Sequence, residues 1–487
     1  MHRRALPGLS ILFLFALFVL PGCGSEEEEQ PPDPFNIVLI TIDTLRADHL
    51  SCYGYGRNTS PSIDRLAEEG ILFQRVFCPI PLTIPSHASI LSGLYPVSHG
   101  SRNNSNPIND SIKTMAQKLE KRGFTTAAVL STGLLEASMC GLEQGFRIYC
   151  DLTRRTIPDD LNQLDSRIVR KDTGPPFPGR VPISGRTAGE AVEVAMKILE
   201  QFRGKKGFLW LHLYDPHTPY SPPGAFNTLF TADEAMHEMK SFNEWQETHS
   251  PEVKERIVDL YDGEIAYADR ELGKFFAKIR EMGWWDRTAI FLTADHGESL
   301  GEHGYYFAHG RDLYAGSVEI PLIIHVPWIR RDGGRVKRPV AVIDIFPTVM
   351  ELAGIIPDPD MPGRSLLQDL RETKRMEGQA IYLENEGDRA PGKHGRGTLS
   401  LEASKKYALV WERWKIIKNP GGALELYDWY MDPAETTNLS ATYPRLKTIL
   451  LEKMDYFQNH LPRRQPGGKG TLSEESAELL QALGYIE

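Results

Sequence analysis

The sequence has few cysteines, no excess of basic residues and no internal repeat. Of its 487 residues five are Cys, and its 55 Lys and Arg are outnumbered by 65 Asp and Glu, which gives a net charge of −10. A nucleic-acid-binding protein usually presents a basic face, so this balance argues against a nucleic-acid partner. It does not exclude an anionic substrate, because the field at a site depends on local charges and metals.

The chain also lacks long apolar runs, apart from one near its first residue. Three basic residues at positions 2–4 precede the run Ile11–Leu20, which is too short to span a membrane comfortably as a mature helix. The sequence L-P-G-C then ends at Cys23, as in a bacterial lipobox, and an acidic, proline-bearing stretch follows. We predict a lipoprotein signal peptide at residues 1–22 and a lipidated Cys23 with a tether at residues 23–34. The alternative is an ordinary cleaved signal with an incidental Cys.

This reading predicts an exported protein that is anchored by lipid to a bacterial membrane and faces the periplasm or the exterior. Export permits disulfides, but the four remaining cysteines allow three pairings and contain no C-x-x-C pair. These residues are Cys52, Cys78, Cys140 and Cys150. Small buried hydrophobic side chains are an equally good interpretation.

Continuous apolar runs alternate with helical patterns in the first two thirds of the chain. The first run, Phe35–Ile42, is rich in β-branched residues, as in a buried parallel strand. Similar runs lie at Thr126–Leu130, Phe208–Leu213, Ala289–Thr293 and Pro321–Val326, and helical patterns at Ser62–Glu69, Ser111–Arg122, Thr187–Phe202 and Pro251–Met282. This alternation predicts an α/β fold with helices on both faces of a sheet.

The pattern changes after Arg364. Strand-like segments lie at Gly397–Ser404, Tyr407–Trp411, Trp414–Lys418 and Ala423–Tyr427, and a helical pattern at Tyr443–His460. We therefore predict a catalytic domain at 35–375 and a small C-terminal α+β subdomain with an antiparallel sheet at 376–487. The Pro-, Asp- and Arg-rich stretch Leu152–Pro182 predicts a long surface loop, a candidate lid.

Potential metal ligands follow three of the predicted strands. Asp43 follows the first, Asp215 and His217 follow another, and the pair Asp295-His296 follows a third. Open α/β sheets bind ligands beyond the carboxyl ends of their strands, and carboxylate and imidazole groups are ligands of divalent cations. Each residue alone could be a helix cap or a surface residue. Several at the same ends of successive strands predict a site.

Thr83 lies just ahead of a predicted helix, in the segment T-I-P-S-H-A-S-I-L-S-G. The positive end of a helix can stabilise an alkoxide or a bound anion there. The alternative is that the Thr83 hydroxyl only caps the predicted helix.

Together these motifs resemble the sulfatase branch of the alkaline phosphatase superfamily. The motifs are x-P-S-x-x-x-x-L-x-G after Thr83, D-P-H-x-P-Y at 215–220, D-H-G-E-x-x-G-E-H-G at 295–304, D-I-F-P-T at 344–348, E-L-Y-D at 425–428 and the tail L-L-Q-A-L-G-Y. The resemblance runs from about residue 35 to the end. It implies a three-layer α/β/α sandwich with a mixed, largely parallel sheet, and hydrolysis of sulfuric or phosphoric esters.

The chain departs from the sulfatase pattern at the nucleophile. Sulfatases generally have Cys or Ser there, which is converted to formylglycine, whereas this chain has Thr83, which that maturation does not use. His87 replaces the usual Arg, Thr44 replaces the second Asp of a D-D pair, and His296 replaces the usual Asn. His309 lies where the family has a Lys. A Thr nucleophile with an Asp-His pair is similar to phosphodiesterases and phosphotransferases of the superfamily.

The resemblance implies one divalent cation, Ca²⁺, Mg²⁺, Mn²⁺ or Zn²⁺, bound by Asp43, Asp295 and His296, with Thr83 completing or adjoining its shell. The expected catalytic residues are Thr83, His87, His217 and His309, and the expected substrate-binding residues are Arg46, Asn104, His217 and His309. An alternative second metal site would use Asp215, His217 and either His303 or His309.

The expected substrate is an anionic ester, namely a sulfated or phosphorylated small molecule, glycan or lipid. Three alternatives remain open. They are a phosphodiesterase or phosphonate monoester hydrolase, a phosphoryl-group transferase, and an inactive lipoprotein that binds a glycan or another anion.

Overall fold

The computed structural model describes residues 31–151, 185–231, 250–329, 334–371, 378–385 and 405–468. Four predictions fall outside these residues: the lipidated Cys23, the candidate lid, the strand at 397–404 and the C-terminal tail motif. The domain limits at 375 and 376 also stay a prediction.

A nine-stranded sheet forms the centre of the fold, in the order β10-β2-β9-β6-β1-β5-β3-β4, with β11 beside β2. Its strands are β1 (Asn36–Ile42), β2 (Ile71–Phe77), β3 (Phe124–Val129), β4 (Ile148–Cys150), β5 (Lys206–Leu213), β6 (Thr288–Ala294), β9 (Glu319–His325), β10 (Gly334–Val336) and β11 (Val340–Ala341). All five predicted apolar runs are strands of this sheet. Only β9 runs antiparallel to its neighbours, β2 and β6, so the sheet is mixed but largely parallel, as predicted.

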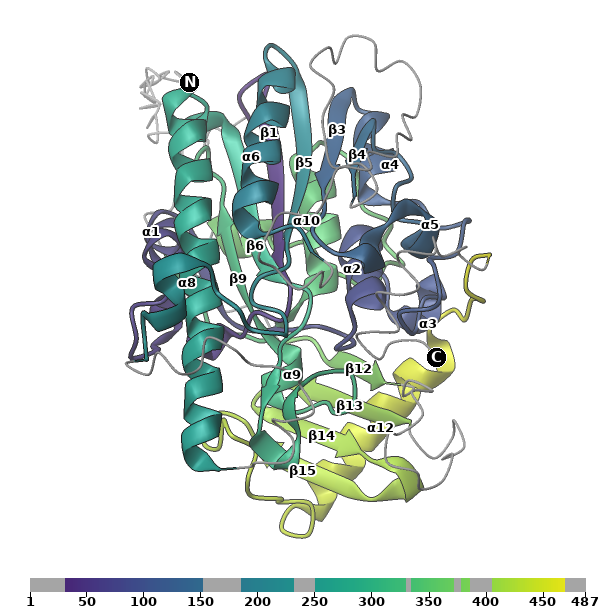
Figure 1. Cartoon of the computed structure of the whole chain (residues 1–487). Helices are drawn as coiled ribbons and strands as arrows, with labels where there is room; N and C mark the ends of the chain where they lie inside the picture. The colour runs from purple at the N-terminus through teal and green to yellow at the C-terminus, as the bar shows by residue number, and fades with distance from the viewer. Residues whose placement is uncertain are drawn as a thin grey trace, which may run out of the picture. The chain divides into compact units, whose positions relative to one another are not determined.

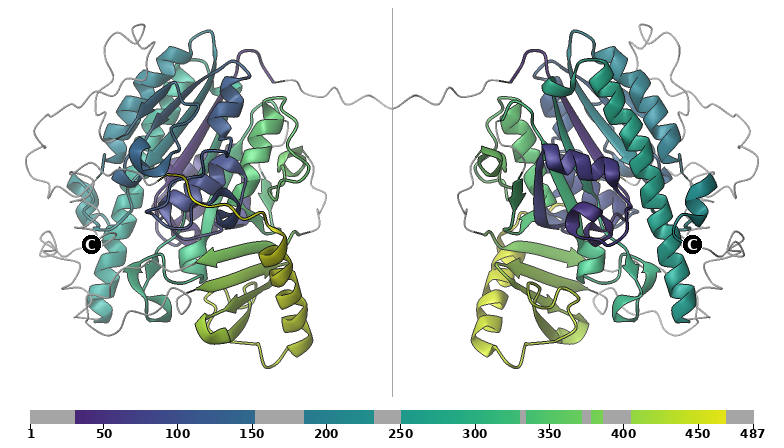
Figure 2. Two further views of the ribbon diagram at one scale, coloured as in Figure 1. Left: turned by 90° about the vertical axis from the view of Figure 1, so that its right-hand side faces the viewer. Right: turned by 90° about the vertical axis from the view of Figure 1, so that its left-hand side faces the viewer.

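Helices cover both faces of the sheet, which explains why every residue of β1 is buried. One group consists of α1 (Pro61–Glu69), α6 (Ala188–Leu199) and α8 (Pro251–Glu281), in which α1 and α6 each pack against α8. The other consists of α2 (Thr83–Ser92), α4 (Met115–Glu120) and α10 (Ile345–Leu352). The two groups lie on opposite faces (Figures 1 and 2). The predicted α/β sandwich is confirmed.

Local signals set the helix limits. The predicted helix at 111–122 begins only at Met115, because Thr114 forms a capping box with Gln117. The 31-residue α8 begins at Pro251, where the Ser250 hydroxyl accepts a hydrogen bond from the Val253 N–H. The remaining short helices are α3 (Pro96–His99), α5 (Ala137–Cys140), α9 (Ala315–Val318) and α11 (Leu367–Arg371).

The C-terminal part forms a separate antiparallel sheet in the order β12-β13-β14-β15. Its strands are β12 (Ile381–Asn385), β13 (Lys406–Trp411), β14 (Trp414–Lys418) and β15 (Leu424–Asp428), and α12 (Pro444–His460) packs against β13 and β14. The small antiparallel sheet and its helix are confirmed. The fully buried β12 was missed, because its five residues are too few to give a clear pattern.

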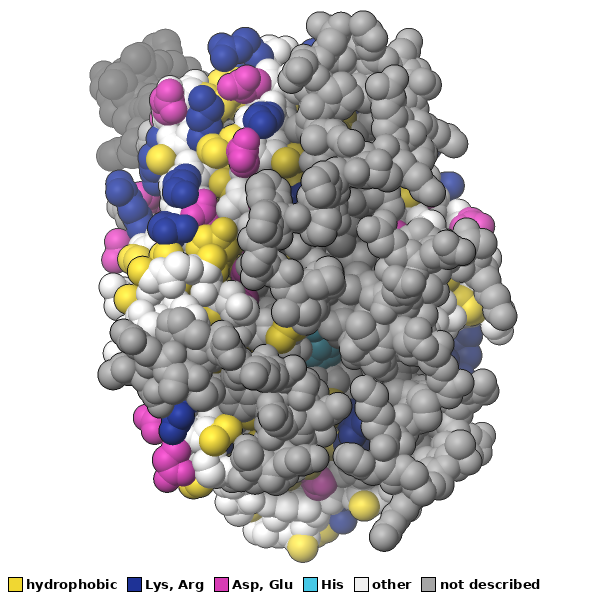
Figure 3. Space-filling view, viewed as in Figure 1, with side chains coloured by type: hydrophobic (Ala, Val, Ile, Leu, Met, Phe, Trp, Pro, Cys, Tyr) yellow, Lys and Arg dark blue, Asp and Glu magenta, His cyan; other side chains and the backbone are white. Residues whose placement is uncertain are grey.

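Among the described residues, Cys52, Cys78, Cys140 and Cys150 form no disulfide with one another. Cys78, Cys140 and Cys150 are buried, as small hydrophobic side chains are. None of the helices in the described ranges is both long and apolar enough to cross a membrane. On the face shown in Figure 3, acidic and basic side chains are interspersed over the described surface.

Candidate active site

The carboxyl ends of three adjacent parallel strands define the site. Ile42, the last residue of β1, pairs with Leu213 of β5 on one side and with Ala294 of β6 on the other. The residues that follow these strands therefore emerge side by side at one edge of the sheet. Asp43 comes directly after β1, and Asp295 comes directly after β6. This register explains why residues some 250 positions apart in the sequence meet.

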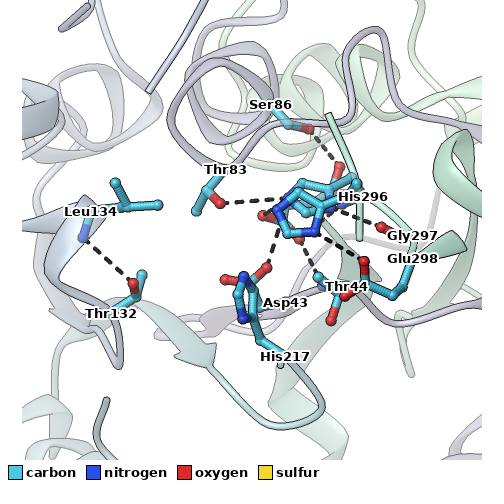
Figure 4. A network of polar contacts seen from close by, with 12 residues as sticks. Asp43, Thr44, Thr83, Ser86, Thr132, Leu134, His217, His296, Gly297 and Glu298 are labelled. Carbon is cyan, nitrogen blue, oxygen red and sulfur yellow. Dashed lines mark hydrogen bonds and ion pairs between the residues drawn. The ribbon is translucent and has the colours of Figure 1, made fainter. Parts of the chain in front are cut away.

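Asp43, Asp295 and His296 form a compact, completely buried group, in which the potential ligand atoms all lie within 4.8 Å of one another. His296 Nε2 is 3.7 Å from Asp43 Oδ1 and 3.4 Å from Asp295 Oδ2. Figure 4 shows Asp43 beside His296, with their contact marked by a dashed line. One nitrogen and two carboxylate groups converge on one point, as divalent-cation ligands do.

The hydrogen bonds of this group are incomplete in a way that fits a cation. Within the described part of the chain, both oxygens of Asp43 and Oδ2 of Asp295 are buried without a hydrogen bond. Such oxygens are costly to bury unless a counter-charge compensates them. His296 Nδ1 lies 3.0 Å from the Gly297 carbonyl and donates to it, which leaves the Nε2 lone pair directed at the carboxylates. The three residues therefore fit a divalent cation.

The pKa values in this group reflect burial without a compensating charge. Burial raises the pKa of Asp43, and burial together with the neighbouring Asp43 raises the pKa of Asp295 to about 7. Burial also lowers the pKa of His296 to about 4, so the imidazole is neutral at pH 7. A neutral imidazole is the form that binds a metal.

Thr83 is the first residue of α2, and its Oγ1 lies 3.4 Å from His296 Nε2. The hydroxyl therefore lies beside the three ligands and at the positive end of a ten-residue helix, two features that favour an oxyanion. The start of α2 is tied to the ligand-bearing strand end, because the Ser86 hydroxyl donates to the Asp295 carbonyl at 2.6 Å. In Figure 4 Thr83 points toward His296.

Asn104 places an amide next to the start of α2. Its Oδ1 accepts a hydrogen bond from the Ile84 N–H at 3.0 Å, which orients the Nδ2 group as the remaining donor. Among the described residues this buried Nδ2 has no hydrogen-bond partner. Its place beside Thr83 suits a contact with a substrate oxygen.

His217 and His309 lie on the other side of the ligand group. The ring centroid of His309 is 4.4 Å from that of His296 and 5.1 Å from that of His217. His217 Nδ1 is 2.6 Å from the Thr218 carbonyl, and His309 Nδ1 is 3.2 Å from Glu298 Oε1. Burial lowers the pKa of both rings, that of His309 to about 4. The structure thus brings together both histidines, Thr83, Asn104 and the three ligands.

His87 and Arg46 have mainly protein partners. The wholly buried His87 ring lies 2.8 Å from the Thr83 carbonyl and 3.1 Å from Thr41 Oγ1. The Arg46 guanidinium binds the carboxylates of Asp48 and Glu302 and the Glu298 carbonyl. The catalytic role of His87 and the substrate-binding role of Arg46 stay predictions, since these contacts fix the surrounding backbone.

The described residues do not bring the ligands of the alternative second metal site into one group, so that site stays a prediction. The described residues contain a single group of three metal-capable side chains, and that group is Asp43, Asp295 and His296. Asp215 accepts a hydrogen bond from the Ala188 N–H at the start of α6, at 2.7 Å. The exposed His303 stacks on Tyr314 at 3.6 Å and contacts the Ala434 carbonyl. Tertiary contacts therefore hold these two proposed ligands elsewhere.

Three residues of the site were missed in the sequence. His212 lies on β5 with Nε2 at 3.5 Å from Asp43 Oδ2, Ser86 anchors α2, and Glu298 contacts His309. A histidine inside the apolar run of β5 was the one visible signal, because a buried polar side chain needs a partner. Ser86 and Glu298 lie within motifs that had already been assigned.

Comparison with known proteins agrees with this geometry. A family model described as Sulfatase matches residues 35–355, and one described as N-sulphoglucosamine sulphohydrolase, C-terminal, matches residues 301–460. The multifunctional alkaline phosphatase superfamily protein PehA of Trinickia caryophylli is 25% identical over 407 residues, which cover 70% of this chain and 77% of that protein. N-acetylglucosamine-6-O-sulfatase of Bacteroides thetaiotaomicron is 22% identical over 548 residues, covering 95% and 93%.

Among solved structures, the phosphonate monoester hydrolase of Agrobacterium radiobacter superposes with a TM-score of 0.68 at 23% identity, covering 87% of this chain and 95% of that one. At this identity the superposition establishes the fold. The Sulfatase match extends over most of the chain, from β1 through α10. It includes the strand ends that carry Asp43 and Asp295, and the start of α2 at Thr83. The chain therefore belongs to the sulfatase family of ester hydrolases.

Proposed function

We propose that this protein is a cation-dependent hydrolase of sulfuric, phosphoric or phosphonic esters in which Thr83 is the nucleophile. The observation that carries the proposal is the position of Thr83 Oγ1, 3.4 Å from His296 Nε2 and beside carboxylate oxygens that are buried without hydrogen bonds. The substrate class is an anionic ester.

The residues of the site supply the parts that such a reaction needs. A bound divalent cation would neutralise charge on the attacked group and favour the ionised hydroxyl. Thr83 Oγ1 attacks the sulfur or phosphorus atom, the bond to the leaving oxygen breaks, and the covalent ester is left on Thr83. The Thr83 hydroxyl gives up its proton to water. His309 or His217 takes up a proton at Nε2 and gives it to the leaving oxygen, and Asn104 Nδ2 donates to a non-bridging oxygen. Water then cleaves the Thr83 ester.

The threonine itself favours phosphorus esters over sulfate esters. A formylglycine hydrate can eject its sulfate by collapsing to the aldehyde, whereas the Thr83 ester must be cleaved by an activated water. The similarity to a multifunctional superfamily protein and to a phosphonate monoester hydrolase supports this preference. The similarity to an N-acetylglucosamine-6-O-sulfatase supports the sulfate alternative.

The test is a panel of nitrophenyl sulfate, nitrophenyl phosphate, bis(nitrophenyl) phosphate and nitrophenyl phenylphosphonate. Thr83→Ala should lower turnover about a thousandfold or more, as expected for a group that forms the covalent intermediate. A matched control is Thr288→Ala, because Thr288 is equally buried but begins β6, at the opposite end from Asp295. Near-native turnover of Thr83→Ala would mean that water attacks directly, and a strong preference for sulfate would refute the argument from threonine.

We further propose that the protein is exported and anchored by lipid at Cys23. The L-P-G-C sequence after the apolar run supports this proposal. Cys23→Ser should release the protein from the membrane fraction or leave it unprocessed, which fractionation and mass determination detect. Unchanged processing and unchanged membrane association would exclude the lipid.

A further inference from the structure

Glu298 is a buried carboxylate that the proposed function leaves without a role. Its side chain has no exposed surface (0%), and Oε1 lies 3.2 Å from His309 Nδ1. Figure 4 shows Glu298 beside the ligand group, on the side away from Thr83. It is not among the three residues that converge as metal ligands in the described structure. The contact with His309 therefore points to a role for Glu298 other than binding the cation.

The backbone around Glu298 is held rigidly on both sides. The Arg46 guanidinium donates to the Glu298 carbonyl at 3.1 Å, and the Gly297 N–H donates to the Ser317 carbonyl at 3.0 Å. A Cβ atom at position 297 would lie only 2.1 Å from the Gly316 carbonyl oxygen, so the segment packs as closely as glycine allows. A carboxylate on such a segment is a fixed reference point for a partner that lies on a loop.

His309 is such a partner, because it lies in the loop that follows the short strand β8 (Tyr306–Ala308). When Nδ1 donates to Glu298, the ring orientation is set and the neutral ring carries its proton on Nδ1. The lone pair of Nε2 is then free to take up a proton, which Nε2 gives to the leaving oxygen while the Glu298 carboxylate stabilises the charged ring. The Tyr305 hydroxyl also donates to the His309 carbonyl, which restrains the main chain of the loop.

We propose that Glu298 is a positioning residue that, through its hydrogen bond to His309 Nδ1, orients the ring so that Nε2 faces the leaving oxygen of the ester. The inference rests on the proposed function and adds a residue to it. A second carbonyl or water partner would hold the ring less firmly than a buried carboxylate, because charge-assisted hydrogen bonds are stronger and shorter.

The first test measures which nitrogen of His309 carries the proton. In the full-length, cation-loaded protein with ¹⁵N-labelled histidine, NMR should show the His309 proton on Nδ1. Glu298→Ala should shift the tautomer population toward Nε2–H, whereas Glu298→Gln should largely preserve it, because the glutamine oxygen can still accept from Nδ1. The matched control is Glu264→Gln, a buried carboxylate of α8 that accepts the Ser221 N–H at 2.6 Å and should leave His309 unchanged.

The second test uses leaving groups that differ in their need for a proton. Nitrophenolate leaves without help, whereas unsubstituted phenolate gains from proton donation. In Glu298→Ala, kcat for phenyl phenylphosphonate should fall about ten- to a hundredfold more than kcat for nitrophenyl phenylphosphonate. Bound cation, measured by elemental analysis, should stay at the wild-type ratio.

Three outcomes would overturn the inference. If Glu298→Ala loses its cation along with its rate, Glu298 is a ligand. If the tautomer is unchanged, the hydrogen bond does not set the ring. If both esters slow equally, His309 is not being oriented toward the leaving oxygen. Should the wild type hydrolyse no ester of the panel, the proposed function fails, and the tautomer measurement alone decides the role of Glu298.

Discussion

Asp43 at the end of β1 and Asp262 in the middle of α8 are both completely buried, and each lies near a histidine. Asp262 accepts hydrogen bonds from His49 at 2.7 Å, from the Tyr55 hydroxyl at 2.6 Å and from Arg57 at 2.8 Å. Neither oxygen of Asp43 has a hydrogen bond among the described residues. The two carboxylates are thus equally buried, but only Asp262 accepts side-chain hydrogen bonds from the described residues.

This difference in hydrogen bonding indicates that Asp262 stabilises the fold, whereas Asp43 is suited to bind a ligand. Asp262 ties the segment after β1 to α8, and its charge is compensated by Arg57 within the protein. Asp43 lies beside the imidazoles of His212 and His296, whose pKa values are lowered by burial, so the free energy of burying its charge remains to be offset by something that binds. Removing each carboxylate should therefore have opposite effects on activity and on stability.

The largest expected effect is on turnover at the ligand group. Stripping the cation, or replacing Asp295 by Ala, should lower kcat by about a thousandfold or more, because several kcal/mol of charge stabilisation are lost. Adding Ca²⁺, Mg²⁺, Mn²⁺ or Zn²⁺ to the stripped wild type should restore turnover to differing degrees. Full activity in exhaustive chelator, or normal cation content in Asp295→Ala, would contradict the assignment.

The next largest effect is on the free energy of unfolding when the Asp262 carboxylate is removed. Asp262→Ala leaves His49 and Arg57 without their shared partner and should lower the free energy of unfolding by about 3–5 kcal/mol. Urea denaturation measures this change. The kcat per folded molecule should stay near that of the wild type. A large loss of kcat with an unchanged free energy of unfolding would contradict the structural role of Asp262. Glu193→Ala, which removes an exposed pair with Lys197, should cost less than about 0.5 kcal/mol.

A third carboxylate, Asp269, lies between these extremes, because it accepts backbone N–H groups of Ser62 and Ile63 but has no cation beside it. Burial raises its pKa from 3.8 to about 6, despite those hydrogen bonds. The folded state therefore favours the protonated form, and this contribution to stability is fully present below pH 3.8 and is lost as pH rises through about 6. The difference corresponds to about 3 kcal/mol.

Asp269→Asn removes this titration. The unfolding free energy of the wild type, measured relative to the variant in urea at a series of pH values, should fall between about pH 4 and pH 6 and then level off. If this difference in unfolding free energy rises with pH instead, the hydrogen bonds from the backbone lower the pKa of Asp269 more than burial raises it.

The smallest expected effect is on the stability of the cation-free protein. Asp43→Asn removes an uncompensated buried charge and should raise the free energy of unfolding in chelator by about 1–3 kcal/mol. With saturating cation the sign should reverse, because the wild type alone gains binding free energy. Thermal unfolding with and without cation measures both signs. Destabilisation of the variant in chelator would mean that Asp43 already has a compensating partner.

The sequence predicted the sheet more fully than it predicted the site. Apolar runs such as Phe35–Ile42 and Ala289–Thr293 are continuous enough to predict strands that are buried on both faces. The short strand β12 was missed, since five residues give little periodicity. The alternative second metal site was predicted from residue types alone, and no local sequence pattern indicates that the His303 ring stacks on Tyr314.

The sequence by itself determined the fold class, the position of Asp43, Thr83 and Asp295 at the ends of their elements, and the unusual threonine. These properties depend on local periodicity and on motifs with fixed spacing. Only the tertiary structure decided which polar atoms lack partners, that Arg46 braces the Glu298 segment and that Glu298 reaches His309. The physical reason is that hydrogen-bond satisfaction and burial depend on side chains brought together from elements far apart in the sequence, and local sequence patterns do not set those distances.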